Sequence, residues 1–243
     1  MLTKSPTRIG LLAGVLLTAQ LLGGACQAAE QTTQVRVTTN FGQFVIEVFN
    51  ERAPITSANF LRYVREGFYS NTLIHRVVAN FVIQGGGHDA TTLQLKPTHD
   101  PVFNESGNGL QNKRGTVGLA RGGSPHSGNA QFYVNLVDNP DLDPVPTRWG
   151  YTVFGHIVQG MDVIEHIGET PTGTVGPFKS DAPLKPVIIE KMEIISGEQA
   201  ANPPPVTPVA PPAVSARSAR QTRSLPGSWS SSPTHASNRS PRM

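Results

Sequence analysis

Cysteine is almost absent from this sequence. Its 243 residues include one cysteine, Cys26, which lies at the end of an apolar N-terminal stretch. A single cysteine cannot form an intramolecular disulfide or supply the paired thiolates of a structural zinc site. Among the seven histidines, His75, His88 and His99 do not show the regular spacing of metal ligands. We therefore expect neither a disulfide nor a bound metal.

The motifs of nucleotide binding and covalent catalysis are also missing. There is no P-loop lysine motif, and Gly85–Gly87, which we expect to follow a strand, lacks the spacing of a dinucleotide fingerprint. Ser124 and Ser127 lie in a glycine-rich loop without the context of an activated nucleophile. The sequence therefore predicts no cofactor and no covalent intermediate.

Acidic residues are confined to the middle of the chain. All 17 lie between Glu30 and Glu198. Two of the 20 basic residues precede this span and five follow it, which leaves 13 cations against 17 anions in the middle. The excess positive charge belongs to the two ends. The middle has no basic surface of the kind that binds nucleic acid, so we expect no nucleic-acid partner.

The N-terminus has the pattern of a secretory signal. Lys4 and Arg8 precede the uncharged apolar run Ile9–Leu22, and small residues follow as far as Ala29. We predict a cleaved signal over residues 1–29 and a periplasmic location. Two alternatives stay open: the apolar run is retained as a membrane anchor, although it is short for a span, or Cys26 is lipidated.

The C-terminal residues 199–243 differ sharply in composition from the middle. They contain nine Pro, nine Ser and five Arg, and no acidic residue. Such a composition buries too little apolar surface to offset chain entropy, which predicts a disordered tail. Its positive charge suggests weak contact with anionic lipids or cell-wall polymers. A solvated tail without a specific partner is the simpler interpretation.

Residues 30–198 have the patterns of a globular, mainly β domain. Many strands and two short helices indicate a barrel or sandwich with helices at its ends. Pro54 begins one helix that stops at Gly67, and a second spans Met161–Ile167 and ends at Gly168. The expected strands are Val35–Thr39, Phe44–Phe49, Thr116–Ala120, Gln131–Leu136, Tyr151–Ile157 and Val187–Ile195.

Four ordered motifs within this domain carry a resemblance to a known family. They are HRVVANFVIQGGG from His75, NKRGTVGLAR from Asn112, NAQFYVNL from Asn129 and GYTVFGHIVQGMDVI from Gly150. The sequence here resembles the cyclophilins, which are peptidyl-prolyl cis-trans isomerases, and is most similar to their periplasmic bacterial members. The resemblance runs from about Val35 to Ile195. It implies a closed eight-stranded antiparallel barrel with a helix over each end, and an active-site groove on its outer face.

The resemblance also implies the site residues. Arg76 matches the catalytic arginine of the family, and Phe81 and Gln84 complete the catalytic set. The resemblance implies that the substrate site also has apolar walls for the proline ring, polar groups for the peptide backbone and a strand that pairs with the bound peptide. The residues that match these parts are Val82, Ala120, Arg121, Gln131, Tyr133, Leu142 and Tyr151.

These residue types suit a reaction that breaks no covalent bond. Resonance in the C–N bond sets a barrier of roughly 18–20 kcal/mol, so an Xaa-Pro bond isomerises slowly unaided. A cation aimed at the proline nitrogen favours the twisted amide over either planar form. The sequence therefore predicts an isomerase that assists the folding of exported proteins, with Arg76 stabilising the twisted amide. Its expected partners are proline-containing segments of unfolded proteins.

Other functions stay open on the sequence alone. A binding module would grip proline-containing peptides without useful turnover, and an adhesin would act through the basic tail. Asp141 stands where the family often has Trp or Phe, an aromatic that matters for binding the cyclic peptide cyclosporin, so we expect weak cyclosporin binding. We expect a monomer, because a closed barrel has no free edge strand.

Overall fold

The computed structural model describes residues 31–195. The predicted signal, residues 1–29, and the predicted tail, residues 199–243, lie outside the described residues. Neither helix within 31–195 is both long and apolar enough to cross a membrane.

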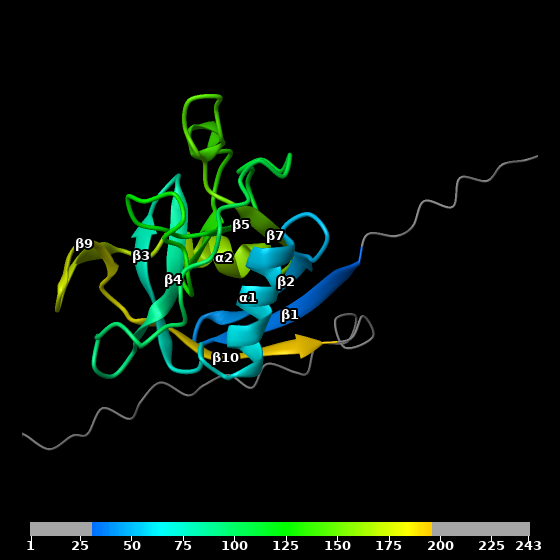
Figure 1. Cartoon of the computed structure of the whole chain (residues 1–243). Coiled ribbons are helices and arrows are strands. Elements are labelled where there is room, and N and C mark those ends of the chain that lie inside the picture. Colours follow the sequence, from blue (N-terminus) through cyan, green and yellow to red (C-terminus); the bar gives the residue numbers. More distant parts are fainter. Residues whose placement is uncertain (1–30, 196–243) are drawn as a thin grey trace, which may run out of the picture. The chain divides into compact units, whose positions relative to one another are not determined.

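Eight strands close into an antiparallel barrel (Figure 1), which confirms the predicted fold class. Going round the barrel, the strands follow the order β1, β10, β3, β4, β6, β5, β7, β2. Their bounds are Thr32–Thr39 for β1, Gly42–Phe49 for β2, Thr72–Val78 for β3, Val82–Asp89 for β4, Thr116–Leu119 for β5, Phe132–Asn135 for β6, Val153–Gln159 for β7 and Val187–Ile195 for β10. The predicted strands are thus present, with ends shifted by at most three residues.

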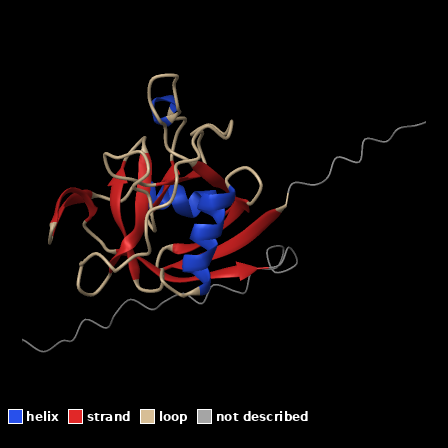
Figure 2. Ribbon diagram, viewed as in Figure 1, coloured by secondary structure: helices blue, strands red, loops and turns tan. Residues whose placement is uncertain are grey.

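Two α-helices pack against the barrel (Figure 2): α1, Pro54–Arg65, and α2, Met161–Gly168. Pro54 suits the first turn of α1 because a backbone N–H there has no helical partner. Ala53 at the N-cap has no capping side chain, and the Glu105 carboxylate instead accepts hydrogen bonds from the amides of Ile55 and Thr56. A distant acid therefore fixes the start of this helix.

Aromatic rings fill the interior where α1 meets the strands. Phe60 of α1 lies 5.0 Å from Phe154, 5.9 Å from Phe132 and 5.5 Å from Tyr69, measured between ring centroids. All four side chains are buried. Burying a side chain of this size stabilises a fold by about 1.5–3 kcal/mol, so this cluster is a major source of rigidity for the strands that carry the site.

The segment Ile74–Gly87 is a hairpin, and the glycine run does not follow a strand as predicted. β3 and β4 meet through a turn in which Asn80 has φ +57°, a conformation that Asn tolerates. The three glycines lie inside β4. A Cβ at Gly86 would come within 2.9 Å of ring carbons of Tyr69 and Phe132, so glycine is needed for close packing.

A short second sheet was not predicted from the sequence. It consists of β8, Thr172–Val175, paired with β9, Phe178–Pro183. A short 3-10 helix, η1, spans Pro140–Leu142 and also lies outside the predicted elements. The β8–β9 hairpin lies beside β3 (Figure 1), where the Phe178 ring stacks on His75 at 5.5 Å and meets His88 edge-on at 4.9 Å.

His75 makes the stability of this region sensitive to acid. Burial, reinforced by the positive charge that His88 and Arg76 can place nearby, lowers the pKa of His75 from 6.5 to about 4. Between these values the unfolded chain binds a proton that the folded chain excludes, so stability falls as the pH drops from about 6.5 towards 4. The full loss is roughly 3 kcal/mol.

Urea unfolding of wild type and His75→Gln at a series of pH values measures this effect. We expect the two stability curves to converge towards acid, because only the wild type carries the penalty of the buried imidazole. Parallel curves between pH 6.5 and 4 would show that His75 is protonated in the folded state without cost.

Candidate active site

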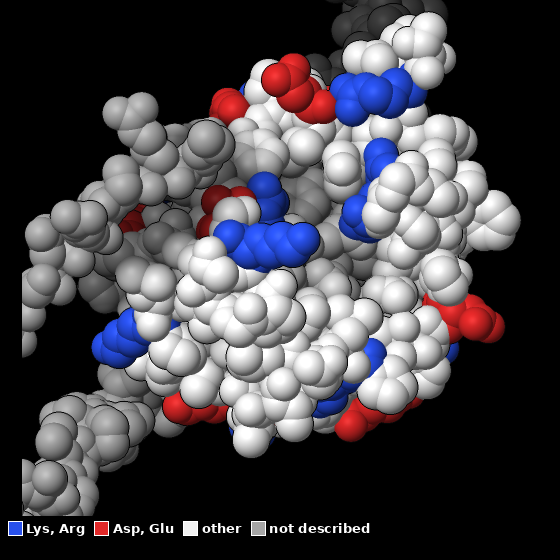
Figure 3. Space-filling model, turned by 90° about the vertical axis from the view of Figure 1, so that its left-hand side faces the viewer, with Lys and Arg blue, Asp and Glu red and all other residues white. Residues whose placement is uncertain are grey.

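One open cavity of about 260 Å³ gathers nine of the ten predicted site residues. It is lined by Arg76, Phe81, Val82, Gln84, Ala120, Arg121, Tyr133, Leu142 and Tyr151. Residues far apart in the sequence reach it from β3, β4, β6, η1 and the segments after β5 and before β7. The face that carries β9 shows Lys and Arg side chains at the borders of a hollow (Figure 3).

Strand alternation separates the cavity from the barrel core. In β4, Val82 and Gln84 line the cavity, whereas Ile83 between them packs in the core. In β6, Tyr133 lines the cavity, and its neighbours Phe132 and Val134 are core residues. The cavity side chains thus form an apolar cluster of their own, separate from the barrel core: Val82, Ala120 and Tyr133, with Phe81, Leu142 and Tyr151 packed against them.

Polar side chains lie along one side of this apolar cluster. Arg76 and Gln84 are directly opposite each other in the β3–β4 pair. Gln84 Nε2 donates to Gln131 Oε1 at 3.0 Å, so the tenth predicted residue, Gln131, lies next to the cavity lining. The Gln131 side chain also lies over the glycine run, since a Cβ at Gly87 would come within 2.5 Å of Gln131 Cγ. The two amides are therefore held in fixed positions.

Arg76 is half-exposed at the edge of the cavity. Its Nε lies 3.6 Å from Oδ2 of Asp181, and the two side chains are 38% and 40% exposed. Within residues 31–195, Arg76 donates no hydrogen bond, and Asp181 is its one ion-pair partner. The terminal nitrogens of the guanidinium are therefore available to a ligand in the cavity.

Arg121, another residue of the cavity lining, is held in place by its neighbours. Its guanidinium lies 4.3 Å from the ring centroid of Tyr151, and its Nη2 donates to the carbonyl of Trp149 at 3.1 Å. The Tyr151 ring in turn meets Tyr133 edge-on at 6.0 Å. Stacking and backbone hydrogen bonds fix this arginine as part of the cavity wall.

A buried layer of amides behind the cavity was missed by sequence reasoning. Asn112 Oδ1 accepts from the Tyr133 hydroxyl at 2.5 Å, and Asn112 Nδ2 donates to Asp143 Oδ1 at 2.9 Å. Asn139 Nδ2 donates to the Phe81 carbonyl at 3.0 Å. Burial, with the nearby Tyr151 and Asp143, raises the pKa of Tyr133 well above its usual value, so the hydroxyl keeps its proton and donates. These contacts hold the cavity floor and the Leu142 segment together.

Comparison with known proteins settles the family. Residues 34–194 match the family model described as cyclophilin type peptidyl-prolyl cis-trans isomerase/CLD. The chain belongs to the cyclophilin family. It is a peptidyl-prolyl cis-trans isomerase, EC 5.2.1.8, and its substrates are proline-containing peptides.

Individual relatives agree with this assignment. The chain is 47% identical over 159 residues to peptidyl-prolyl cis-trans isomerase B of Escherichia coli, covering 64% of this chain and 96% of that protein. It is 41% identical over 186 residues to a peptidyl-prolyl cis-trans isomerase of Acinetobacter baylyi, covering 76% and 94%. A Cryptosporidium parvum cyclophilin type isomerase, crystallised in the presence of the dipeptide Ala-Pro, superposes with a TM-score of 0.58 at 27% identity, covering 68% and 99%.

The cyclophilin carries no evident metal centre in the part of the chain that the structure describes. Residues 31–195 contain no group of three or more His, Cys, Asp or Glu side chains placed to share an ion. The cavity itself is lined by two arginines, a glutamine and apolar or aromatic side chains.

Gly118 leaves room for the Tyr133 ring of this cyclophilin. A Cβ at position 118 would lie 2.2 Å from Tyr133 Cζ and 2.3 Å from its Oη. Gly118→Ala is expected to push the ring off Asn112 into the cavity, lowering stability by about 1–3 kcal/mol and raising KM. Gly107→Ala is the matched control, because nothing lies within 4 Å of its added Cβ. Equal KM values in the two variants would contradict this role for Gly118.

Asp141 does not line the cavity and is exposed in η1. We keep the expectation of weak cyclosporin binding. Asp141→Trp should raise the affinity for cyclosporin, because an aromatic ring there adds apolar contact area beside Leu142, which lines the cavity. Calorimetric titration of both proteins measures the effect. Nanomolar binding by the wild type would refute the expectation.

Proposed function

We propose that prolyl isomerisation takes place in this cavity and that Arg76 stabilises the twisted amide. The observation that carries the proposal is the placement of Arg76. Its guanidinium lies at the edge of a cavity whose apolar side is formed by Phe81, Val82, Tyr133 and Leu142, and its terminal nitrogens donate no hydrogen bond to residues 31–195. The apolar side suits the proline ring, and the nearby guanidinium suits the nitrogen of that ring.

The reaction proceeds without covalent catalysis in this proposal. When the C–N bond twists, resonance is lost and the proline nitrogen regains a lone pair. A guanidinium donor interacts more strongly with this pyramidal nitrogen than with either planar amide, so it lowers the barrier rather than simply tightening binding. Arginine stays charged at all physiological pH values and offers several donors.

The remaining polar groups hold the peptide on one side of the rotating bond. Gln84 and Gln131 are fixed to each other by their hydrogen bond and present amide groups beside Arg76. Their role is to bind the peptide backbone on one side of the proline. With the ring clamped in the apolar cluster, only the segment between these two anchors turns.

An NMR titration of the purified, isotope-labelled protein with an Ala-Pro tetrapeptide tests the location. We expect intermolecular NOEs between the proline ring protons and the side chains of Phe81, Tyr133 and Leu142. A larger hollow of about 390 Å³, lined in part by Pro144, Val145 and Trp149, is the main alternative. NOEs to that hollow instead would refute the proposed site.

We further propose that the isomerase acts on exported proteins in the periplasm. The support is the signal-like pattern of residues 1–29: two cations, an uncharged apolar run and small residues before Glu30. Osmotic-shock fractionation of a bacterial host followed by mass spectrometry tests this. We expect the mature protein in the shock fraction, starting near Glu30. The intact mass in the cytoplasmic fraction would overturn the proposal, and the intact mass in the membrane would support an anchor.

A further inference from the structure

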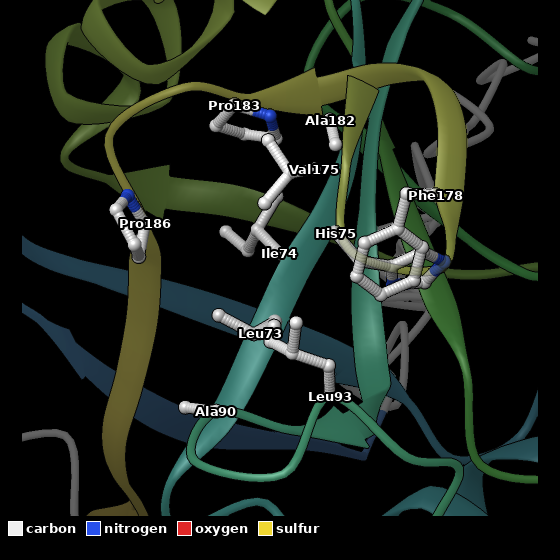
Figure 4. A pocket seen from close by; sticks show the side chains of 10 residues that line it. All are labelled: Leu73, Ile74, His75, Ala90, Leu93, Val175, Phe178, Ala182, Pro183 and Pro186. Atoms are coloured by element: carbon white, nitrogen blue, oxygen red, sulfur yellow. The ribbon is translucent and has the colours of Figure 1, made fainter. Parts of the chain in front are cut away.

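The β8–β9 hairpin is attached to β3 by an apolar contact surface. Leu73 and Ile74 of β3 face Val175, Ala182 and Pro183 of the hairpin around a small pocket, and Phe178 lies against His75 (Figure 4). Ala182 and Pro183 are buried. The hairpin is therefore fixed to the same strand that carries Arg76.

An irregularity in this hairpin aims one carboxylate at Arg76. The pairs Gly173–Ala182 and Val175–Phe178 enclose one residue on β8 but three on β9, so β9 bulges. Asp181 belongs to the bulge and has φ +59°, a left-handed conformation in which a non-glycine residue is uncommon. From this position its Oδ2 lies 3.6 Å from Arg76 Nε. Bulges commonly redirect a side chain in this way.

We propose that Asp181 is a positioning residue for Arg76, holding the Nε side of the guanidinium so that the terminal nitrogens face the cavity. The close approach is to Nε, the nitrogen nearest the aliphatic stem, and neither terminal nitrogen donates a hydrogen bond to residues 31–195. A carboxylate there limits rotation of the guanidinium plane without occupying the donors needed at the substrate. This inference rests on the proposed role of Arg76.

Positioning and charge neutralisation act in opposite directions. A nearby carboxylate also weakens the positive potential of the guanidinium, which would slow the reaction. Both side chains are more than a third exposed, so solvent screens this charge effect. Restricting the guanidinium in the reactive orientation should therefore dominate. Because exposed ion pairs are weak, we expect an effect of about fivefold on kcat.

Two substitutions at position 181 separate the contributions. Asp181→Gly keeps the positive φ without strain and removes the carboxylate, whereas Asp181→Asn also tolerates the left-handed conformation and keeps an oxygen acceptor. Measured on the purified full chain, kcat should fall about fivefold in the glycine variant and less in the asparagine variant, with KM unchanged in both. Glu165→Gln is the matched control, because it removes another half-exposed ion pair, which Glu165 of α2 forms with Arg114.

The same substitutions in an Arg76→Ala background complete the test. If Asp181 acts through Arg76, Asp181→Gly should leave the residual rate of Arg76→Ala unchanged. An equal fall in both backgrounds, or a rise in kcat with either substitution at 181, would overturn the inference. Wild-type activity in the Arg76→Ala protein would instead refute the proposed role of Arg76, so the two failures are distinguishable.

Discussion

Arg76→Ala is expected to lower kcat/KM for an Ala-Pro peptide by about 10²–10³. The reason is that the guanidinium stabilises charge that develops only when the amide twists, and removing one preorganised donor of this kind typically costs that much. Circular dichroism should be unchanged, because the Arg76 side chain is half-exposed and is not part of the core. A protease-coupled assay of peptide isomerisation measures the rate.

Arg76→Lys is the informative companion variant. Lysine keeps the charge but replaces the planar fork with a single ammonium group on a flexible stem. We expect its activity to lie between those of wild type and Arg76→Ala, because charge alone recovers part of the stabilisation. Wild-type rates in both variants would mean that the apolar walls suffice for catalysis.

Asn112→Ala is expected to destabilise the fold by roughly 2–4 kcal/mol, because three hydrogen bonds between side chains are lost and the buried Tyr133 hydroxyl is left without a partner. The other two lost bonds are those to Asn135 Nδ2, which keeps Thr116 Oγ1, and to the half-buried Asp143 Oδ1, which keeps the backbone amide of residue 112. Activity should fall as well, since the Tyr133 ring and the segment that carries Leu142 are held through this amide. Urea unfolding, read beside kcat/KM, measures both effects.

Two further variants serve as references for the stability change of Asn112→Ala. Gln111→Ala changes an exposed neighbour and should alter stability by less than about 0.5 kcal/mol. Tyr133→Phe removes one of the three contacts and should cost about 1 kcal/mol with activity largely kept, because the ring remains. If Asn112→Ala were no more destabilising than Tyr133→Phe, the amide layer would not be the support that its geometry indicates.

Local patterns were sufficient to predict six of the eight barrel strands and both α-helices, whereas closure into a barrel was implied only by the family resemblance. The β1–β2 hairpin, α1 and α2 have alternation or helical periodicity and clear turn residues at their ends, so short-range physics determines them. The β8–β9 hairpin was missed because its strands are short and half-exposed and contain Gly, Asp and Pro. Gly85–Gly87 are expected after a strand because glycine is typical of turns, although they lie inside β4 and serve close packing in the sheet.

The site residues also differ in whether local sequence or only tertiary contacts reveal them. Taken alone, Val82 would be predicted as a core residue, and it is indeed buried; only the ordered motifs pointed to a cavity. Asn112 and Asp181 gave no signal, since their partners Tyr133 and Arg76 lie far away in the sequence. Tertiary packing brings such pairs together, and local sequence propensities do not predict these contacts.

The most direct test of the central claim is the cis–trans exchange rate of an Ala-Pro peptide while it is bound, measured by NMR at saturating peptide. Wild type and Arg76→Ala are compared, and the dissociation constant is obtained in the same titration. We predict that the bound exchange rate falls by about 10²–10³ in the variant while the affinity stays nearly constant, because Arg76 acts on the twisted amide. An unchanged bound exchange rate with weakened affinity would show that Arg76 serves binding only and would contradict this account.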